Sequence, residues 1–210
     1  MRGTVHVTGN TSIDALFGTL RDLPAPRLSE RTCPQLLVTC HRRENWGERL
    51  KAIAGGLVDV AGSGSATIEV LLHPNGHVAD AMRKLLAGRA GIRLLEPCSH
   101  RELLQRMRAC DLILSDSGGI QEEAPALGVP LLVLRDKTER PEGLETGNMM
   151  LVGADRDAIA ATVQGLLSQP TRLAAMARPA LPFGDGRAAP RIAAIIEQWL
   201  EVRCAVRRRA

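Results

Sequence analysis

Aromatic side chains are scarce in this sequence, which has two Trp, two Phe and no Tyr among its 210 residues. The core must therefore be built mainly from aliphatic side chains. Proteins that bind single-stranded nucleic acids stack the bases on aromatic rings, so the scarcity argues against that class of partner. Part of the net charge of +4 comes from a run near the end of the chain: Arg203, Arg207, Arg208 and Arg209. Such a run is usually a solvated helix end, with nucleic-acid binding as the weaker alternative, and we expect no nucleic-acid partner.

The sequence also lacks paired cysteines and long apolar stretches. Its five cysteines are odd in number and include no C-x-x-C pair: Cys33, Cys40, Cys98, Cys110 and Cys204. This usage is typical of reduced thiols in the cytoplasm. No run of 18 apolar residues could span a membrane, and residues 1–20 lack the charged-then-apolar pattern of a signal peptide. We therefore expect a cytoplasmic protein with no membrane partner.

Short apolar runs alternate with amphipathic segments along most of the chain. The runs predict strands at 36–41, 67–73, 92–95, 112–115, 130–134 and 150–152. Helices are predicted from about residue 11 and over 46–61, 78–87, 99–109, 117–127, 155–167 and 189–206, with Ser99 and Glu102 forming a capping box. This alternation indicates an α/β fold with a doubly wound parallel sheet. Residues 24–34 form a Pro-bounded linker, so we assign 1–34 to a connector and 35–210 to the domain.

Four polar loops follow predicted strands: 41–45, 73–76, 116–119 and 135–143. Ligands of doubly wound sheets bind at the carboxyl ends of the strands. The four loops should therefore lie on one rim of the sheet and form the binding site.

The segment 115–123 (SDSGGIQEE) follows a strand and opens a helix. Ser117 can cap this helix, and Gly118 and Gly119 let the backbone approach a ligand closely, which suits phosphate at a helix N-terminus. An ordinary Ser-Gly turn is the equal alternative. The segment is neither a Walker loop nor a G-x-G-x-x-G motif. Glu123 can accept hydrogen bonds from the two hydroxyls of a ribose, although a solvated helix carboxylate would look the same.

A dense polar set follows the first strand of the sheet. It comprises His41, Arg42, Arg43, Glu44 and Asn45. The arginines suit phosphate because a guanidinium binds two oxygens at once, and His41 brings a titratable imidazole. Arg140 lies in the charged loop 135–143, next to Pro141, where its backbone is restrained. A charged turn is the alternative for the segment 41–45.

No residues have the spacing of a metal site. His73 and His77 are four residues apart, but Pro74 and Gly76 argue against a helix through both. The remaining candidates are Cys98, His100 and Cys110, which we interpret as structural. We expect no metal and no other cofactor.

Together these segments resemble the non-hydrolysing UDP-N-acetylglucosamine 2-epimerases. The resemblance is carried by VTGNTSIDAL (7–16), HRREN (41–45), HPN (73–75) and DSGGIQEEAPALGVPLLVLRDKTERPEG (116–143). It implies a Rossmann-like C-terminal lobe of the two-lobed GT-B fold that many nucleotide-sugar glycosyltransferases share. We expect the N-terminal lobe to be missing from this chain, or supplied separately, and full-length members of the family to form homodimers.

The resemblance also implies an activity. The family interconverts UDP-N-acetylglucosamine and UDP-N-acetylmannosamine by eliminating UDP across C1–C2 and adding it back, without a metal or redox cofactor. By resemblance His41 is catalytic, and UDP or UDP-N-acetylglucosamine contacts the loops named above: Arg42, Arg43, Glu44, Asn45, Ser117, Gly118, Gly119, Glu123 and Arg140. Arg42 and His73 match positions linked to a second, activating UDP-N-acetylglucosamine site.

Two positions depart from the family pattern, and two other functions stay open. Gly76 replaces the usual proline after HPN, which should loosen that turn, and Asn148 replaces a common threonine. One alternative is a UDP-sugar-binding module that is inactive alone. The other is a glycosyltransferase lobe, which would share the phosphate-binding turn but not HRREN or TERPEG.

Overall fold

The computed structural model describes residues 3–25 and 33–207. Most of the predicted linker 24–34, together with Arg208 and Arg209, therefore lies outside the described residues. The chain divides into two compact units, one made of Met1–Asp22 with Phe183–Ala210 and the other of Leu23–Pro182. The contacts thus group the end of the chain with its beginning, and our boundary at residue 34 stays a prediction.

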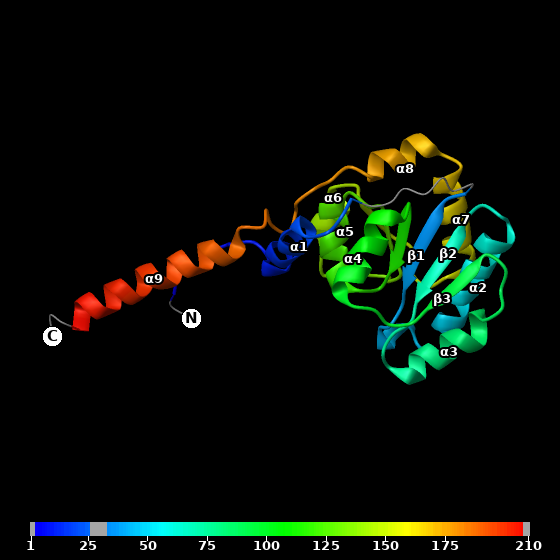
Figure 1. Ribbon diagram of the computed structural model, residues 1–210, viewed down its shortest axis with the longest axis horizontal. Coiled ribbons are helices and arrows are strands. Elements are labelled where there is room, and N and C mark those ends of the chain that lie inside the picture. Colours follow the sequence, from blue (N-terminus) through cyan, green and yellow to red (C-terminus); the bar gives the residue numbers. More distant parts are fainter. Residues whose placement is uncertain (1–2, 26–32, 208–210) are drawn as a thin grey trace. The chain divides into compact units, whose positions relative to one another are not determined.

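The larger unit is built on a six-stranded, wholly parallel sheet (Figure 1). Its strand order is β3-β2-β1-β4-β5-β6. The strands are β1 (Gln35–Thr39), β2 (Thr67–Leu71), β3 (Ile92–Leu95), β4 (Leu112–Ser115), β5 (Leu131–Val133) and β6 (Met149–Leu151). All six strands were predicted, and the doubly wound α/β fold is confirmed. The direction of winding reverses between β1 and β4, which is where such sheets bind ligands.

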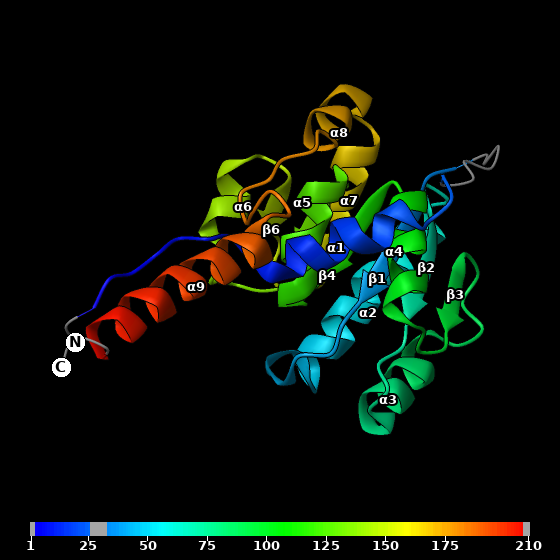
Figure 2. The ribbon, with the colours of Figure 1, turned by 60° about the vertical axis from the view of Figure 1, so that its left-hand side comes forward.

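Helices cover both faces of this sheet (Figures 1 and 2). The helices are α2 (Glu48–Gly62), α3 (Gly76–Leu86), α4 (His100–Ala109), α5 (Gly118–Leu127) and α7 (Arg156–Leu167). The apolar sides of α2, α3 and α7 share one aliphatic core with alternate strand residues such as Leu36 and Val38. Helix α4 contacts α5 on the opposite face, where Leu37 and Ile113 are buried. Alternation along each strand sends neighbouring side chains to opposite faces, so one strand serves both cores.

Helix starts fix the loops of the rim. The capping box of Ser99 and Glu102 is confirmed. Ser117 occupies the N-cap position of α5, but its side chain makes no cap hydrogen bond, so that part of the prediction is wrong. Helix α3 begins at Gly76, earlier than predicted, because the Asn75 side chain accepts the main-chain N–H of His77. This cap holds the turn that we expected Gly76 to loosen.

Two short α-helices and a 3₁₀ helix (Arg43–Asn45) were not predicted. Helix α6 (Pro141–Glu145) begins in the charged loop, and α8 (Pro170–Met176) follows α7. Each begins with proline at its first turn, where the missing N–H has no partner to lose. Segments this short show too little periodicity for sequence patterns to detect.

The smaller unit consists of α1 (Thr11–Arg21), α9 (Ala188–Arg207) and the segments beside them. Asp14 of α1 accepts the main-chain N–H groups of Ala188 and Ala189 at 3.0 and 2.9 Å, and so caps the start of α9. Gly186 has φ +77° and lies against the Phe17 ring, so only glycine fits there. In the described part of the chain, no helix combines the length and apolarity needed to cross a membrane.

Candidate functional site

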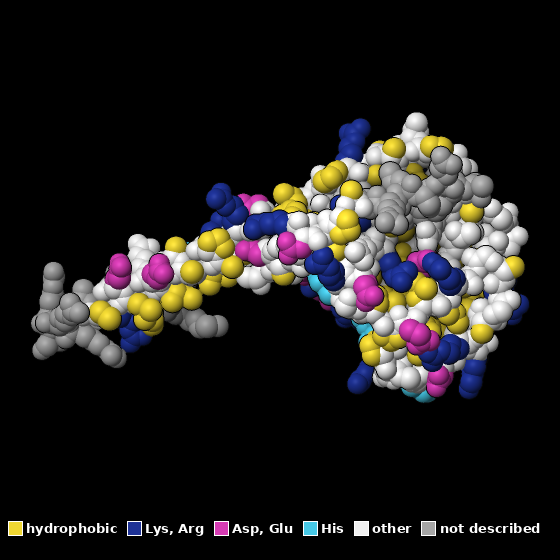
Figure 3. Space-filling model, viewed as in Figure 1, with side chains coloured by type: hydrophobic (Ala, Val, Ile, Leu, Met, Phe, Trp, Pro, Cys, Tyr) yellow, Lys and Arg dark blue, Asp and Glu magenta, His cyan; other side chains and the backbone are white. Residues whose placement is uncertain are grey.

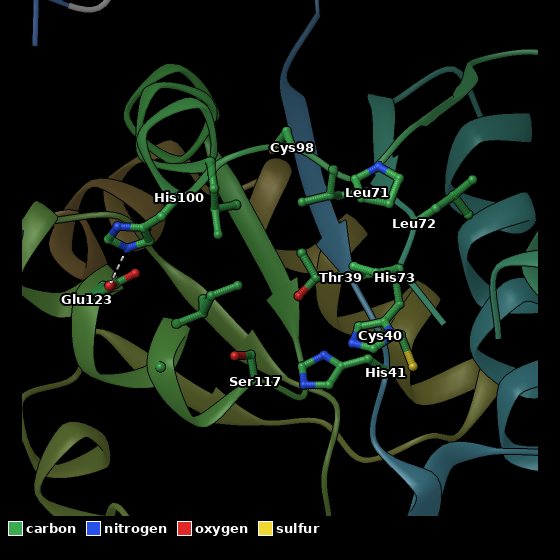
Figure 4. Close-up of a pocket in the computed structure, with 15 residues that line it drawn as sticks. Thr39, Cys40, His41, Leu71, Leu72, His73, Cys98, His100, Ser117 and Glu123 are labelled. Atoms are coloured by element: carbon green, nitrogen blue, oxygen red, sulfur yellow. Dashed lines mark hydrogen bonds and ion pairs between the residues drawn. The ribbon is translucent and has the colours of Figure 1, made fainter. Parts of the chain in front are cut away.

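A cavity of about 260 Å³ opens at the carboxyl ends of β1, β2, β3 and β4 (Figure 4). Five of the predicted site residues line it: His41, His73, Ser117, Gly119 and Glu123. In Figure 4, Ser117 lies between the His41–His73 rings and Glu123. The loops at 41–45, 73–76 and 116–119 therefore meet on one rim, as the sequence predicts.

The N-terminus of α5 lies beneath two arginine side chains. A Cβ placed on Gly118 would lie 3.3 Å from Nη2 of Arg42 and 3.4 Å from Cζ of Arg140. Helix geometry leaves the first amides of α5 without intrahelical acceptors, and the Ser117 hydroxyl does not cap them. Because Gly118 has no side chain, the first amides of α5 and the two guanidinium groups border one small space. This combination suits a phosphate or diphosphate.

Carboxylates hold Arg140 in this position. Its Nε and Nη2 each lie 2.7 Å from Oε1 of Glu122, whose side chain is only 11% exposed. Oε1 of Glu139 lies 3.6 Å from Nη1 of Arg140 and 3.7 Å from Nη2 of Arg42. The Thr138 hydroxyl accepts the main-chain N–H of Arg140. The charged loop is therefore fixed against the helix rather than free in solvent.

Glu123 is paired with a histidine that the sequence analysis missed. Its Oε1 lies 2.7 Å from Nε2 of His100, which also lines the cavity (Figure 4). Burial raises the pKa of Glu123, and the hydrogen bond and charge of His100 oppose that rise. We interpreted His100 as structural because it has no metal spacing. The available signal was its place at the start of α4, directly after the Ser99 cap, where the loop from β3 ends on the same rim.

The His41 imidazole is held between two groups. Its ring stacks on that of His73, with centroids 5.1 Å apart and planes inclined by 9°, and its Nδ1 lies 3.2 Å from Oδ1 of Asp116. Burial lowers the pKa of His41 and outweighs the nearby Asp116 charge, which raises it. The neutral ring is therefore favoured, and it can act as a proton acceptor near neutral pH.

The other members of the 41–45 set lie off the cavity. Asn45 is fully buried and donates its amide to Oδ2 of Asp116 and to the Leu134 carbonyl at 2.9 and 3.0 Å. Arg43 is exposed, and Glu44 pairs with Arg135 at 2.7 Å. Asn45 thus supports the site from behind, and contacts of Arg43 and Glu44 with a substrate stay predictions.

The two closely spaced histidines do not converge. His73 stacks on His41, whereas His77 packs against Trp46 with centroids 5.5 Å apart. Residues 3–25 and 33–207 contain no cluster of three or more His, Cys, Asp or Glu side chains that could hold a metal ion. All five cysteines fall within the described ranges, and none of them forms a disulfide. The reactive groups that the described residues bring to this rim are arginines, histidines, carboxylates and helix amides.

Charge on the drawn surface is mixed in sign. On the face shown in Figure 3, basic and acidic side chains of the larger unit are interspersed. Nucleic-acid binders instead gather basic side chains into a patch or stripe. The described side chains on the face drawn in Figure 3 show no such patch over the larger unit.

A family model described as UDP-N-acetylglucosamine 2-epimerase matches residues 2–197. The chain belongs to the UDP-N-acetylglucosamine 2-epimerase family. It is 39% identical over 207 residues to a probable UDP-N-acetylglucosamine 2-epimerase of Ralstonia solanacearum, covering 93% of this chain and 55% of the relative. Against the Bacillus subtilis enzyme it is 38% identical, with coverages of 90% and 50%. The chain thus spans about half the length of its curated relatives and corresponds to their C-terminal half.

Solved structures of the epimerase family share this fold. The Neisseria meningitidis epimerase bound to UDP-GlcNAc superposes with a TM-score of 0.85 at 36% identity, covering 91% of this chain and 55% of that one. The Methanocaldococcus jannaschii epimerase in complex with UDP-GlcNAc and UDP has a TM-score of 0.75 at 31% identity, with coverages of 92% and 54%. The Rossmann-like lobe of the GT-B fold is thereby confirmed.

Proposed function

We propose that this chain binds the UDP part of UDP-N-acetylglucosamine at the cavity between β1 and β4. The observation that carries the proposal is the meeting of Arg42 and Arg140 over Gly118 at the N-terminus of α5. The diphosphate occupies this point, where it receives hydrogen bonds from the Ser117 hydroxyl and from the Gly118 and Gly119 amides, and charge from both arginines.

The nucleoside part lies deeper in the same cavity. Glu123 accepts hydrogen bonds from the ribose hydroxyls, a role that its buried, partly countered carboxylate suits. Leu71, Leu72 and Leu103 also line the cavity, and an apolar wall suits the faces of a planar base. That solved structures of other family members are bound to UDP-GlcNAc, or to UDP-GlcNAc and UDP, supports UDP as the ligand.

The reaction in which the chain takes part is inversion at C2 of the sugar. A base removes the C2 proton while the C1–oxygen bond to UDP breaks, which leaves an unsaturated sugar and free UDP. In the return step UDP adds back to C1 and a proton arrives at C2 from the opposite face. His41 handles one of these protons, because its neutral ring lies at the rim beside the diphosphate site.

The 210-residue chain alone acts as a binding module. Inversion needs one proton-transfer group on each face of the sugar. In the described part of the larger unit, His41 is the group that we assign to this task, and it lies on one side. The second group and the closed, water-free cleft come from the other half of such an epimerase, whether joined to this chain or separate. The homodimer of full-length members stays a prediction.

Calorimetric titration of the chain with UDP tests the binding proposal. We expect a dissociation constant on the order of millimolar to tens of micromolar, because half of the enclosing surface is supplied elsewhere. Glu123→Ala should weaken binding. Equal affinity of the two proteins would contradict the role of Glu123 at the ribose. The absence of binding heat with the wild type would contradict the whole proposal.

Deuterium incorporation tests the catalytic part. The chain is incubated with UDP-N-acetylglucosamine in heavy water, and the mass of the nucleotide sugar is followed. We expect no incorporation by the chain alone and some after a separately expressed N-terminal half is added. Clear incorporation by the pure chain, abolished by His41→Asn, would show that this half is catalytically complete.

A further inference from the structure

A buried carboxylate lies directly behind the imidazole of His41. Asp116 follows β4 and is fully buried. Its Oδ2 accepts the main-chain N–H of Arg42 at 2.8 Å, the main-chain N–H of His41 at 3.0 Å and the Asn45 amide at 2.9 Å. These donors come from the loop after β1 and fix the carboxylate, so that its other oxygen stays 3.2 Å from Nδ1 of His41.

That position discriminates between the two forms of a neutral imidazole. One ring nitrogen carries the proton and the other a lone pair. A lone pair on Nδ1 would be repelled by the carboxylate oxygen, whereas an N–H there is attracted. We infer that Asp116 is a positioning residue that holds the proton of neutral His41 on Nδ1, so that Nε2 offers its lone pair as the proton acceptor. The catalytic use of this lone pair rests on the proposed function, but the position of the proton does not.

The groups around His41 keep the ring neutral and in place. Asp116, from the turn between β4 and α5, favours the protonated ring, whereas burial, His73 and Arg42 favour the neutral one. The net effect is a lowered pKa, so the tautomer of the neutral ring decides which nitrogen can accept a proton. Stacking on His73 covers one ring face and hinders rotation of the ring away from Asp116.

The first test is the tautomer in the wild-type chain. Nitrogen-15 labelling of the five histidines and a long-range nitrogen–proton NMR spectrum at neutral pH show which nitrogen of each neutral ring is protonated. His41 is assigned by the signals lost in His41→Asn. We expect its proton on Nδ1. A proton on Nε2 overturns the inference without any variant of Asp116, and the measurement needs no UDP, so it is readable even if the proposed function fails.

The second test is Asp116→Asn. The amide oxygen can take the place of Oδ2, where four donors including the Cys40 thiol meet, which leaves the amide NH₂ facing Nδ1 of His41. That NH₂ must donate to Nδ1, so the ring proton should move to Nε2. A proton that remains on Nδ1 in a folded Asp116→Asn protein would reduce Asp116 to a structural role and overturn the inference.

Asp111→Asn is the matched control. Asp111 precedes the same strand, and its carboxylate also accepts a main-chain N–H of β1, that of Gln35 at 2.8 Å. It lies at the opposite end of β4 from the cavity. We expect the His41 tautomer to be unchanged in this variant. A tautomer that moved there as well would assign the effect to general loosening of the sheet and count against Asp116.

Discussion

Replacing Arg140 by alanine probes the diphosphate site at its most constrained point. The guanidinium is held by two contacts of 2.7 Å to Glu122, and its Cζ lies 3.4 Å from the Cβ position of Gly118. Its side chain is 26% exposed, so solvent screens its charge only in part. The variant removes one of the two guanidinium groups over α5 and leaves the helix amides in place.

The expected loss follows from the strength of charge-assisted hydrogen bonds. Such a bond contributes roughly 1.5–3 kcal/mol, which corresponds to a roughly 10- to 150-fold weaker affinity for UDP. Alanine also leaves Glu122 with one cation fewer beside the incoming phosphates, which adds repulsion. Comparing Glu122→Gln with the double variant Arg140→Ala/Glu122→Gln isolates the lost contact of Arg140, because glutamine at position 122 does not repel the phosphates.

The assay is calorimetric titration with UDP, after circular dichroism has shown that each variant is folded. Arg140→Lys keeps the charge but not the planar fork, so its affinity should lie between those of wild type and alanine. Arg156→Ala is the matched control, since Arg156 also makes a two-pronged contact with a carboxylate, that of Asp59, but outside the cavity. Wild-type affinity in a folded Arg140→Ala protein would refute the assignment of the diphosphate to this point.

Three further outcomes are expected. Asn45→Ala should lower the free energy of unfolding by about 1–3 kcal/mol in urea titrations, because both buried acceptors of its amide lose a donor. Gly118→Ala should weaken UDP binding without unfolding the chain, since its methyl group enters the space beneath the guanidinium groups. Burial raises the pKa of Glu123 above its ordinary value of 4.5; a raised carboxyl pKa destabilises the fold fully above the folded-state pKa and not at all well below the unfolded one. Glu123→Gln should therefore raise the thermal midpoint at neutral pH but leave it unchanged well below pH 4.5.

The fold could be predicted because its elements are regular and its core is aliphatic. Runs such as 112–115 lie between turn residues and are buried on both faces, so they carry a strong strand pattern. The start of the helix after Ser99 was predicted because the capping box fixes it, and the helix ends at Ala109 as predicted. The short helices α6 and α8 were missed, since each depends on a proline turn and tertiary contacts rather than on periodicity.

The candidate site could be predicted only where its residues follow one another in a motif. His41 and Ser117 lie in loops that the sequence marks as polar strand ends, Glu123 lies in the helix that Ser117 precedes, and the structure brings all three to one cavity. The place of His100 in the site was not predicted, because its partner Glu123 lies 23 residues further along the chain. Asn45 was grouped with the ligand-binding residues, although it faces Asp116 behind the rim, and a sequence does not show which way a loop side chain turns.

The contacts of the acidic side chains in the segment 116–123 explain how an anion site can contain several carboxylates. Each is engaged by groups from another element: Asp116 accepts the main-chain N–H of Arg42 and the Asn45 amide beside the His41 ring, Glu122 binds Arg140 and Glu123 binds His100. Unpaired, these charges would repel a diphosphate at the start of α5. Paired, they set the positions of the groups that we propose to contact the diphosphate, the ribose and the C2 proton. The field at Gly118 can then stay positive, because the two guanidinium groups and the helix dipole act there at close range while the carboxylates are countered.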